Sequence, residues 1–402
     1  MKKKIPLSHR TAGIQYAIRD VVVPAQKLEQ QGHKILNLNI GDPLSHKGFS
    51  TPLHMIEAYK KALQSQINGY SPSYGISELR EAIAYDEKGK KNGGWNCSAN
   101  DVYVTTGVTE ALQIIFSTFL EPGDEVLIPG PYYPPYIAYP PIFDGIVKEY
   151  RLNSTDGWRI DLNDLKTKLN NKVKLLILVN PNNPTGGIVN KEELESILKM
   201  VNTYPNCSII SDEIYDLYNF ENNHISTASI SSETPVITLN GVSKGYYAPG
   251  WRVGYMAIHD PENRLIEIRK GVEQLLRSRL CAPTPAQYGY LAGLTQDKGW
   301  MEEYLLKLLK HRDYAVNEIN KIPGLQTEKP KGSFYMFPKI LDDKYSNHDK
   351  KFVLDLLKKE HVLLVHGSGF SKNFGTGHFR IVFIPEINTL KEAFKRINRF
   401  IN

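Results

Sequence analysis

The chain has 402 residues, of which 41% are hydrophobic and 23% are charged. This composition is typical of globular proteins and excludes the disordered and fibrous classes. The formal net charge of +6 is spread along the chain, so we expect no binding of nucleic acid. A chain of this length exceeds the size at which one hydrophobic core keeps growing, which favours two domains.

The cysteines and the first residues of the chain bear on its location. Cys97, Cys207 and Cys281 are an odd number without short spacing, so the sequence predicts neither a disulfide framework nor a metal site. The lysines at 2–4 are followed by polar residues rather than by the apolar run of a secretory signal. No apolar segment reaches the length of a membrane-spanning helix. The sequence therefore predicts a cytoplasmic protein that does not enter a membrane.

Between residues 102 and 259, short apolar runs alternate with amphipathic stretches of helical period. This pattern predicts an α/β fold in which helices cover a mostly parallel sheet. The predicted strands are residues 102–105, 125–128, 175–179, 208–211, 236–239 and 253–257. Ligands of open α/β sheets bind at the carboxyl ends of the strands. We therefore expect five of the loops that follow these strands to line one crevice.

The chain beyond residue 260 has a different pattern. Helical periodicity extends to residue 280 and again over 300–322, as in a connector between two domains. Strands are predicted near 333–337, 362–365 and 379–383, and helices near 350–360 and 390–401. We expect a large domain over 46–295 and a smaller α+β domain over 296–402. Residues 1–45 are predicted to form an N-terminal arm and part of the smaller domain.

The segment over residues 240–254 brings an amine, a hydroxyl and a guanidinium close together. Ser243 adjoins Lys244, and Arg252 follows eight residues later. A lysine amine can be joined to the aldehyde of pyridoxal phosphate. An arginine suits the phosphate of that cofactor, because it makes charge-assisted bidentate hydrogen bonds. Taken alone, Lys244 is more simply explained as a solvated surface lysine.

Polar residues at other strand ends fit the same chemistry. Asp212 follows a buried strand and would keep a pyridine nitrogen protonated, although a helix N-cap is the alternative. Asn183 lies in a proline-rich turn, where it either binds a phenolic oxygen or only forms the turn. Gly107 precedes a helical stretch whose N-terminus suits a phosphate. Tyr133 and Tyr215 also follow strands, and simple packing is the alternative for both.

Segments along nearly the whole chain resemble one protein family. They are residues 36–43, 69–75, 180–186, 212–215, 240–244, 279–282, 332–339 and 378–382. Together they resemble the class I and II aminotransferases of fold type I, which depend on pyridoxal 5′-phosphate, and among these the bacterial alanine aminotransferases. The resemblance implies a mostly parallel seven-stranded sheet between helices, a smaller α+β domain, and a homodimer with shared active sites.

The resemblance also implies which residues bind the cofactor. Lys244 is joined to the cofactor's aldehyde and then moves the substrate's α-proton. Asp212 pairs with the ring nitrogen, and Tyr133 stacks on the ring. The phenolic oxygen is bound by Asn183 and Tyr215. The residues that hold the phosphate are Gly107, Val108, Thr109, Ser243 and Arg252, together with Tyr70 of the neighbouring subunit.

Two positions depart from the family pattern. Val108 stands where many relatives carry a small polar residue, and Gly241 stands where others carry a serine. Each departure implies one hydrogen bond fewer to the phosphate, for which Ser243 is a candidate replacement.

For the substrate, the resemblance implies that Arg380 binds the α-carboxylate, with Asn183 and the backbone of Gly41 beside it. Tyr16 and Arg19 resemble an N-terminal segment of the alanine-type enzymes, so Arg19 is a candidate for binding the second carboxylate of glutamate. Arg279 is the rival candidate, and a salt bridge is the alternative for either arginine.

These expectations combine into one predicted reaction. The sequence predicts transfer of an amino group from L-alanine to 2-oxoglutarate, which yields pyruvate and L-glutamate with ping-pong kinetics. An aspartate or aromatic aminotransferase is one alternative, and a pyridoxal-phosphate-dependent carbon–sulfur lyase of the same fold is another. A nicotinamide dehydrogenase is disfavoured, because Gly107 lacks the companion glycines of a dinucleotide-binding turn.

Overall fold

The core of the protein is an eight-stranded sheet. The computed structural model describes residues 5–12 and 17–402, without the side chains at positions 9, 12 and 17–19. The strands follow one another across the sheet in the order β2-β9-β8-β7-β6-β3-β4-β5. Their bounds are β2 (Val102–Thr105), β3 (Glu125–Gly130), β4 (Ile146–Asn153), β5 (Arg159–Ile160), β6 (Val173–Val179), β7 (Ser208–Asp212), β8 (Val236–Gly241) and β9 (Gly254–His259).

This sheet confirms the predicted α/β fold and differs from the expectation at one edge. Each of the six strands predicted by position is present, to within a few residues. β4 has no counterpart among them, because Lys148, Glu149 and Arg151 interrupt its apolar pattern and only two of its eight residues are buried. The two-residue strand β5 then pairs with β4 and adds an eighth strand to the seven expected.

The strand directions bring five strand ends to one edge of the sheet. β3, β6, β7 and β8 pair in parallel in that order. β9 is antiparallel to both β8 and β2, so β2 points the same way as the parallel strands. The carboxyl ends of β2, β3, β6, β7 and β8 therefore share one edge, where the predicted crevice should lie.

Helices bury both faces of the sheet, as its apolar strands require. Along β6, Leu175 and Ile177 belong to the core cluster that contains α5 (Val108–Phe119) and α10 (Ile266–Arg279). Leu176 and Leu178 belong to the other core cluster, which contains α8 (Lys191–Val201). This alternation follows from the two-residue period of a strand.

Smaller sheets form the C-terminal part of the chain. One has the order β11-β15-β14, and its strands are β11 (Tyr335–Met336), β14 (Val365–His366) and β15 (Phe379–Val382). β10 (Leu325–Gln326) pairs with β12 (Lys339–Ile340). The helices of this part are α12 (Trp300–Lys321), α13 (Asp349–Glu360) and α14 (Ile387–Ile401). These elements agree with the strands and helices predicted beyond residue 300.

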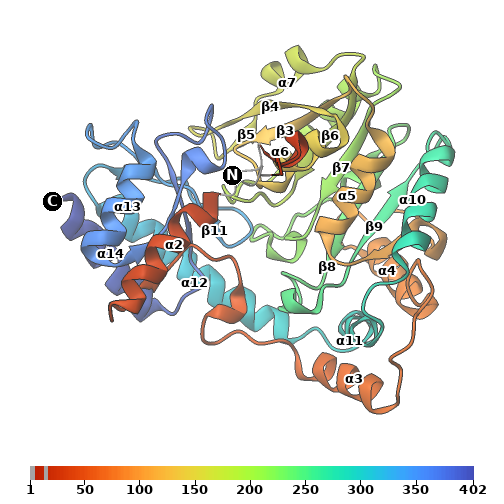
Figure 1. Ribbon diagram of the computed structural model, residues 1–402, viewed down its shortest axis with the longest axis horizontal. Coiled ribbons are helices and arrows are strands. Elements are labelled where there is room, and N and C mark those ends of the chain that lie inside the picture. The colour runs from red at the N-terminus through yellow and green to blue at the C-terminus, as the bar shows by residue number, and fades with distance from the viewer. Residues whose placement is uncertain (1–4, 13–16) are drawn as a thin grey trace.

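The chain from α2 (Ala17–Gln30) to β1 (Leu36–Asn37) packs against this C-terminal part. β1 pairs in parallel with β13 (Val362–Leu363). α2 lies beside α13 (Figure 1). The N-terminal segment thereby carries residues 38–42 from β1 towards the large sheet.

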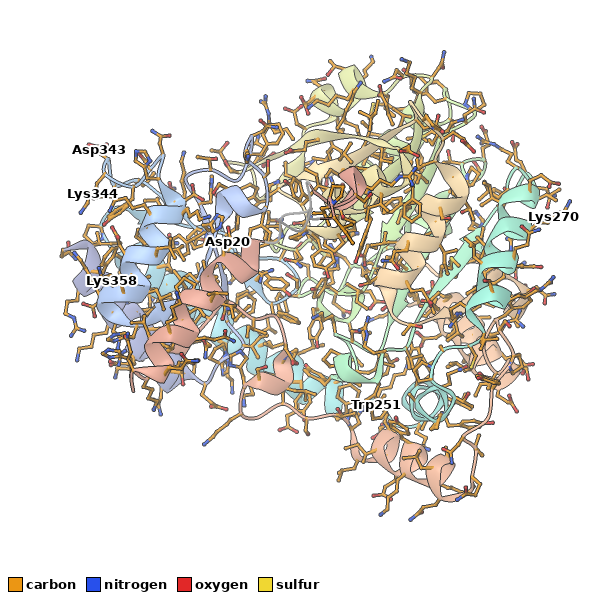
Figure 2. All side chains as sticks on the ribbon, viewed as in Figure 1. Asp20, Trp251, Lys270, Asp343, Lys344 and Lys358 are labelled. Carbon is orange, nitrogen blue, oxygen red and sulfur yellow. The ribbon has the colours of Figure 1, made fainter. Side chains whose placement is uncertain are left out.

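The remaining helices surround the large sheet or connect its strands. They are α1 (His9–Ala12), α3 (Leu53–Gln64), α4 (Ser77–Gly89), α6 (Pro135–Ala138), α7 (Leu162–Lys168), α9 (Thr227–Ile230) and α11 (Thr284–Thr295). Among the described residues, no helix is both long enough and apolar enough to span a membrane. Exposed charged side chains lie far apart, with Lys270 at one end of the molecule and Asp343 and Lys344 at the other (Figure 2).

Candidate active site

A cavity of ≈ 300 Å³ lies at the shared carboxyl edge of the strands. Segments from five strand ends of the large sheet, the segment that follows β1, and two strands of the C-terminal part contribute to it. Its lining residues are Asn39, Ile40, Gly41, Asp42, Val108, Thr109, Tyr133, Tyr136, Val179, Asn183, Asp212, Ile214, Tyr215, Ser243, Lys244, Pro249, Arg252, Tyr335 and Arg380. Most of the residues predicted for cofactor and substrate are therefore brought together.

Lys244 lies in the loop after β8 and is not a surface lysine. Its Nζ donates to the backbone oxygen of Gly41 at 2.7 Å, and it forms no ion pair within the described part of the chain. Burial lowers the pKa of Lys244 to about 8, and the nearby charges of Arg380 and Arg252 act in the same direction, against Asp42. A neutral amine, which is the nucleophilic form, is thus accessible near neutral pH.

Asp212 is the last residue of β7, and its side chain is only 3% exposed. Its carboxylate accepts hydrogen bonds from the Tyr136 hydroxyl at 2.5 Å and from the backbone N–H of Ile214 at 3.2 Å. Burial raises the pKa of Asp212 to about 6 despite these bonds. The helix-cap alternative does not hold, because the next helical turn begins only at Asp216. A buried carboxyl group without a cationic partner among the described residues suits a protonated ring nitrogen.

Tyr136 is a site residue that the sequence analysis missed. It is fully buried in the short helix α6, and its ring packs edge-on against Tyr133 with 5.6 Å between centroids. Its hydroxyl is the side-chain donor to Asp212. Its position three residues after Tyr133 is the one signal in the sequence, and nothing local indicates its contact with Asp212.

The start of α5 and Arg252 form a pocket for an anion. Gly107 has φ +80°, and a Cβ at this position would lie 2.5 Å from a guanidinium nitrogen of Arg252. Arg252 donates to the backbone oxygens of Thr106 and Pro249, each at 3.1 Å, and has no acidic partner in the described residues. Thr109 and Ser243 line the same end of the cavity. Free helix N–H groups beside an unpaired guanidinium are a suitable site for a phosphate.

Close backbone packing explains why position 241 is a glycine. A Cβ on Gly241 would lie 2.5 Å from the Cα of Gly254, and a Cβ on Gly254 would lie 2.8 Å from the Cα of Gly107. The backbones of β8, β9 and the phosphate loop therefore approach too closely for side chains. This contact explains why a serine does not fit at position 241, whereas we find no such contact that explains Val108.

Arg380 on β15 provides a second unpaired cation. It is 2% exposed, and it donates to the Asn183 side-chain oxygen at 3.0 Å and to the Asn39 backbone oxygen at 2.6 Å. Its guanidinium lies 4.6 Å from the ring centroid of Tyr335 and 4.8 Å from that of Phe370. No carboxylate of the described residues pairs with it. A buried guanidinium without an anion is suited to a substrate carboxylate.

Asn182 and Asn183, in the turn after β6, have different roles. Asn182 forms the turn, since its side-chain oxygen accepts from the backbone N–H and the hydroxyl of Thr185. Asn183 instead lines the cavity and contacts Arg380. The alternative that Asn183 only forms the turn is therefore not what the structure has.

Tyr215 and Tyr133 also face the cavity. Tyr215 is buried, and its hydroxyl lies 3.0 Å from the hydroxyl of Tyr335. Burial, with the nearby Tyr335 as a further cause, raises the pKa of Tyr215 well above its ordinary value. The Tyr215 hydroxyl therefore keeps its proton and is able to donate a hydrogen bond.

Gly107, Tyr70 and Arg279 are not among the described lining residues, although Gly107 lies against Arg252, which is. Tyr70 is 82% exposed, in a loop outside the site. Arg279 donates to the backbone oxygens of Val104 and Ser73 and lies 3.5 Å from Glu110, so the salt-bridge alternative holds for it. Tyr16 lies outside the described residues, and Arg19 is described only in its backbone, within α2.

Comparison with known proteins shows the family of the chain. A family model described as aminotransferase class I and II matches residues 33–397. Glutamate-pyruvate aminotransferase AlaA of Haemophilus influenzae is 37% identical over 99% of this chain and 98% of its own length. Alanine aminotransferase of Mycobacterium bovis is 34% identical over 98% of this chain and 92% of its own.

Solved structures agree as well. Alanine aminotransferase from Pyrococcus furiosus is 48% identical and superposes with a TM-score of 0.95, covering 98% of this chain and 99% of its own. A double mutant of Thermus thermophilus aspartate aminotransferase is 29% identical, with a TM-score of 0.89 over 99% and 100% of the two chains. The chain therefore belongs to the class I and II aminotransferases, enzymes of fold type I that use pyridoxal 5′-phosphate.

Proposed function

We propose that this aminotransferase exchanges an amino group between the pair L-alanine and pyruvate and the pair L-glutamate and 2-oxoglutarate. The names of the most similar relatives support alanine as the donor. The observation that carries the proposal is that a half-buried lysine, Lys244, and a buried arginine, Arg380, face one cavity, and neither forms an ion pair with a described residue. One provides an amine for the chemistry, and the other provides a guanidinium for the α-carboxylate.

The groups around the cavity fit pyridoxal phosphate. An amine, a carboxyl group without a cation and a guanidinium beside a helix N-terminus match the aldehyde, the ring nitrogen and the phosphate of the cofactor. When bound, the cofactor supplies an aldehyde that takes up the amino group and a ring that withdraws electrons. In the assignment that we propose, the residues that hold it are Gly107, Val108, Thr109, Tyr133, Asn183, Asp212, Tyr215, Ser243, Lys244 and Arg252, with Tyr70 from a partner subunit.

Lys244 is the residue that moves the proton. Its amine would accept the proton from the α-carbon of the amino acid and return it to the carbon of the cofactor's aldehyde group. A pKa near 8 suits this work, because both the neutral and the charged amine are populated near neutral pH. The Tyr218 hydroxyl donates to the Lys244 backbone oxygen at 2.8 Å and keeps the loop in place.

Arg380 orients the substrate. Its planar guanidinium binds the α-carboxylate with two hydrogen bonds, while Asn183 and the Asn39 backbone hold the arginine in position. The backbone of Gly41 lies next to Lys244 and borders the same space. Fixing the carboxylate aims the α-hydrogen at the Lys244 amine, which lowers the entropic part of the barrier.

Arg19 is our candidate for the second carboxylate of glutamate, with Tyr16 beside it in sequence. Two considerations support it. Arg279, the rival, is already engaged with Glu110 and two backbone oxygens. Arg19 belongs to α2, which packs against the C-terminal part that carries Arg380.

We also propose a homodimer in which Tyr70 reaches the phosphate of the partner subunit. Tyr70 is 82% exposed, so its side chain is accessible to a second subunit. The loop is anchored by Thr284, whose hydroxyl donates to the Gly69 oxygen at 2.8 Å, and by Gln287, which donates to the Ser71 hydroxyl at 2.9 Å. Leu280, 48% exposed in the segment just before Thr284, adds apolar surface.

The domain division stays as predicted, with 46–295 as the large domain and 296–402 as the small one. The pairing of β1 with β13 supports assigning part of 1–45 to the small domain. Arg380 then lies in the small domain and Lys244 in the large one, so a relative movement of the two would open and close the site. The cytoplasmic location remains a prediction from sequence.

One assay tests the proposed reaction. The purified enzyme with its cofactor is incubated with L-alanine and 2-oxoglutarate, and pyruvate, L-glutamate and ammonia are measured. We expect pyruvate and L-glutamate in equal amounts. L-Aspartate is the second candidate donor, since an aspartate aminotransferase shares the fold closely, and a faster reaction with aspartate would contradict the alanine proposal. With L-cysteine in place of L-alanine, release of sulfide, pyruvate and ammonia without L-glutamate would indicate a carbon–sulfur lyase.

A further inference from the structure

Tyr335 is a buried residue of β11 that lines the cavity and has no role in the assignments above. Three contacts distinguish it from a tyrosine that only packs. Its hydroxyl lies 3.0 Å from the Tyr215 hydroxyl, its ring lies 4.6 Å from the Arg380 guanidinium, and its hydroxyl occupies space beside Gly41.

The contact with Gly41 fixes where the Tyr335 hydroxyl sits. A Cβ at Gly41 would lie 1.9 Å from the hydroxyl oxygen, so any side chain at position 41 would displace it. The backbone oxygen of Gly41 accepts the hydrogen bond from Lys244. The Tyr335 hydroxyl is therefore held close to the backbone segment that contacts the reactive amine.

The contact between the Tyr335 and Tyr215 hydroxyls limits which of the two donates the hydrogen bond. A phenolic hydroxyl has one hydrogen to donate, and its oxygen also accepts hydrogen bonds. If Tyr215 donates its hydrogen to a ligand in the cavity, the hydrogen between the two tyrosines has to come from Tyr335. A hydroxyl that accepts one bond becomes a better donor in the next, since hydrogen bonds in a chain polarise one another.

We propose that Tyr335 is a positioning residue whose hydroxyl donates to Tyr215 and thereby directs the single Tyr215 proton to the phenolic oxygen of the cofactor. This inference rests on the proposed contact between Tyr215 and the cofactor. The aromatic ring of Tyr335 also keeps one face of Arg380 covered. The two parts of the side chain are separable, because Tyr335→Phe removes only the hydroxyl.

The test is a double-mutant cycle with Tyr335→Phe, Tyr215→Phe and the double variant. Tyr150→Phe is the matched control, because Tyr150 is a buried tyrosine whose hydroxyl donates to the Ile177 backbone at 2.7 Å, away from the cavity. Two quantities are measured on each protein. They are the cofactor dissociation constant, and the pH midpoint of the absorbance change of the bound cofactor at saturation.

We expect Tyr335→Phe to weaken cofactor binding about fivefold, as for loss of one hydrogen bond, and to move the absorbance midpoint to higher pH. The midpoint rises because Tyr215 then donates a weaker hydrogen bond and leaves more negative charge on the phenolic oxygen of the cofactor. This negative charge makes the cofactor's titrating proton, which lies next to that oxygen, harder to remove. In the Tyr215→Phe background the same substitution should have no further effect. Tyr150→Phe should change neither quantity, and all four variants should keep the circular dichroism of the folded enzyme.

Each other outcome has a distinct meaning. If Tyr215→Phe changes both quantities and Tyr335→Phe changes neither, the inference about Tyr335 is wrong and the proposed role of Tyr215 stands. Additive effects in the double variant would also overturn the inference, because Tyr335 would then act independently of Tyr215. If Tyr215→Phe itself changes neither quantity, the proposed cofactor contact of Tyr215 fails, and the inference fails with it.

Discussion

The two halves of the active site are built differently. The half that we assign to the cofactor consists of residues at or just after strands of one sheet, namely Asp212 after β7, Lys244 after β8, and Gly107 after β2. The half that we assign to the substrate combines residues 39–42, which follow β1, with Arg380 from the C-terminal strand β15. The first half has its geometry fixed by a single core, whereas the second depends on how separate parts of the chain pack together.

This difference predicts two classes of variant. Changes in the cofactor half should lower turnover and cofactor affinity. Changes in the substrate half should raise the KM for amino acids and leave the cofactor in place. The largest effect belongs to Lys244.

Lys244→Ala removes the amine that binds the aldehyde and moves the proton. We expect turnover to fall by at least about 10⁴-fold, because nucleophile and proton carrier are lost together. Cofactor binding should be retained in part through Arg252 and Asp212. Steady-state kinetics and absorbance measure the two effects, and Lys270→Ala, at an exposed position on α10, is the control. Full activity of Lys244→Ala would remove this residue from the mechanism.

Asp212→Asn tests the buried carboxylate of the cofactor half. An amide has no negative charge to hold the ring nitrogen protonated, so electron withdrawal by the ring weakens. We expect turnover to fall by about 10³-fold with a smaller change in KM. Stopped-flow measurement of the reaction with alanine alone checks this, and a variant with unchanged turnover would contradict the proposed pairing.

Arg380→Met tests the substrate half. Loss of a bidentate, charge-assisted contact should lower kcat/KM for alanine by about 10²–10³-fold, mostly through KM, while the cofactor dissociation constant is unchanged. Arg312→Met is a matched control, since Arg312 is a buried arginine of α12 that pairs with Asp313 outside the cavity. A weakened cofactor with an unchanged KM would contradict the division into two halves.

The pKa of Asp212 predicts a pH effect on the stability of the cofactor-free protein. Its pKa of about 6 in the folded chain lies above its ordinary value of 3.8, so the folded state holds this proton more tightly than the unfolded state. Stability from this group is therefore present below about pH 4 and is lost as the pH rises to about 6, by up to about 3 kcal/mol.

Urea unfolding between pH 4 and 7 measures this effect as the difference between the wild type and Asp212→Asn. The amide does not titrate, so the variant should lack this part of the pH dependence. With the cofactor bound, the positive ring nitrogen should lower the pKa of Asp212. The wild type should then no longer lose stability between pH 4 and 6 relative to Asp212→Asn. If the free energy of unfolding depends on pH in the same way for both cofactor-free proteins, the prediction is refuted.

Tyr136→Phe has the smallest expected effect. It removes one hydrogen bond to Asp212 and leaves the bond from the Ile214 backbone. We expect turnover to fall about three- to tenfold, as for loss of one hydrogen bond to a charged group. The Tyr150→Phe variant is again the control, and equal effects of the two substitutions would mean that Tyr136 contributes only packing.

The difference between the two halves of the site also explains which of its residues could be predicted from the sequence. The six predicted strands of the large sheet are almost wholly buried and mainly apolar, so pattern and motif were enough to find their ends and the residues that follow them. Strand β4 was missed because it is half exposed and charged. Tyr335 lies in a segment that resembles the family, yet it was assigned no role, because its contacts with Tyr215 and Arg380 join residues far apart in the chain.

Two features of the site follow from packing rather than from pattern. Tyr136 acts on Asp212 from a helix 76 residues earlier in the chain. The contact of Gly241 with Gly254 and of Gly254 with Gly107 depends on the order of β8, β9 and β2 in the sheet. Neither relation has a local sequence signal, since strand order is a property of the whole fold.

The central claim is that the Lys244 amine carries the cofactor. Borohydride reduction of the purified, cofactor-loaded enzyme, followed by proteolysis and mass spectrometry, tests it most directly. We predict a single modified peptide, with the reduced pyridoxal phosphate adduct on Lys244 and on no other lysine. An adduct on a different lysine, or none in an enzyme that remains active, would contradict the account.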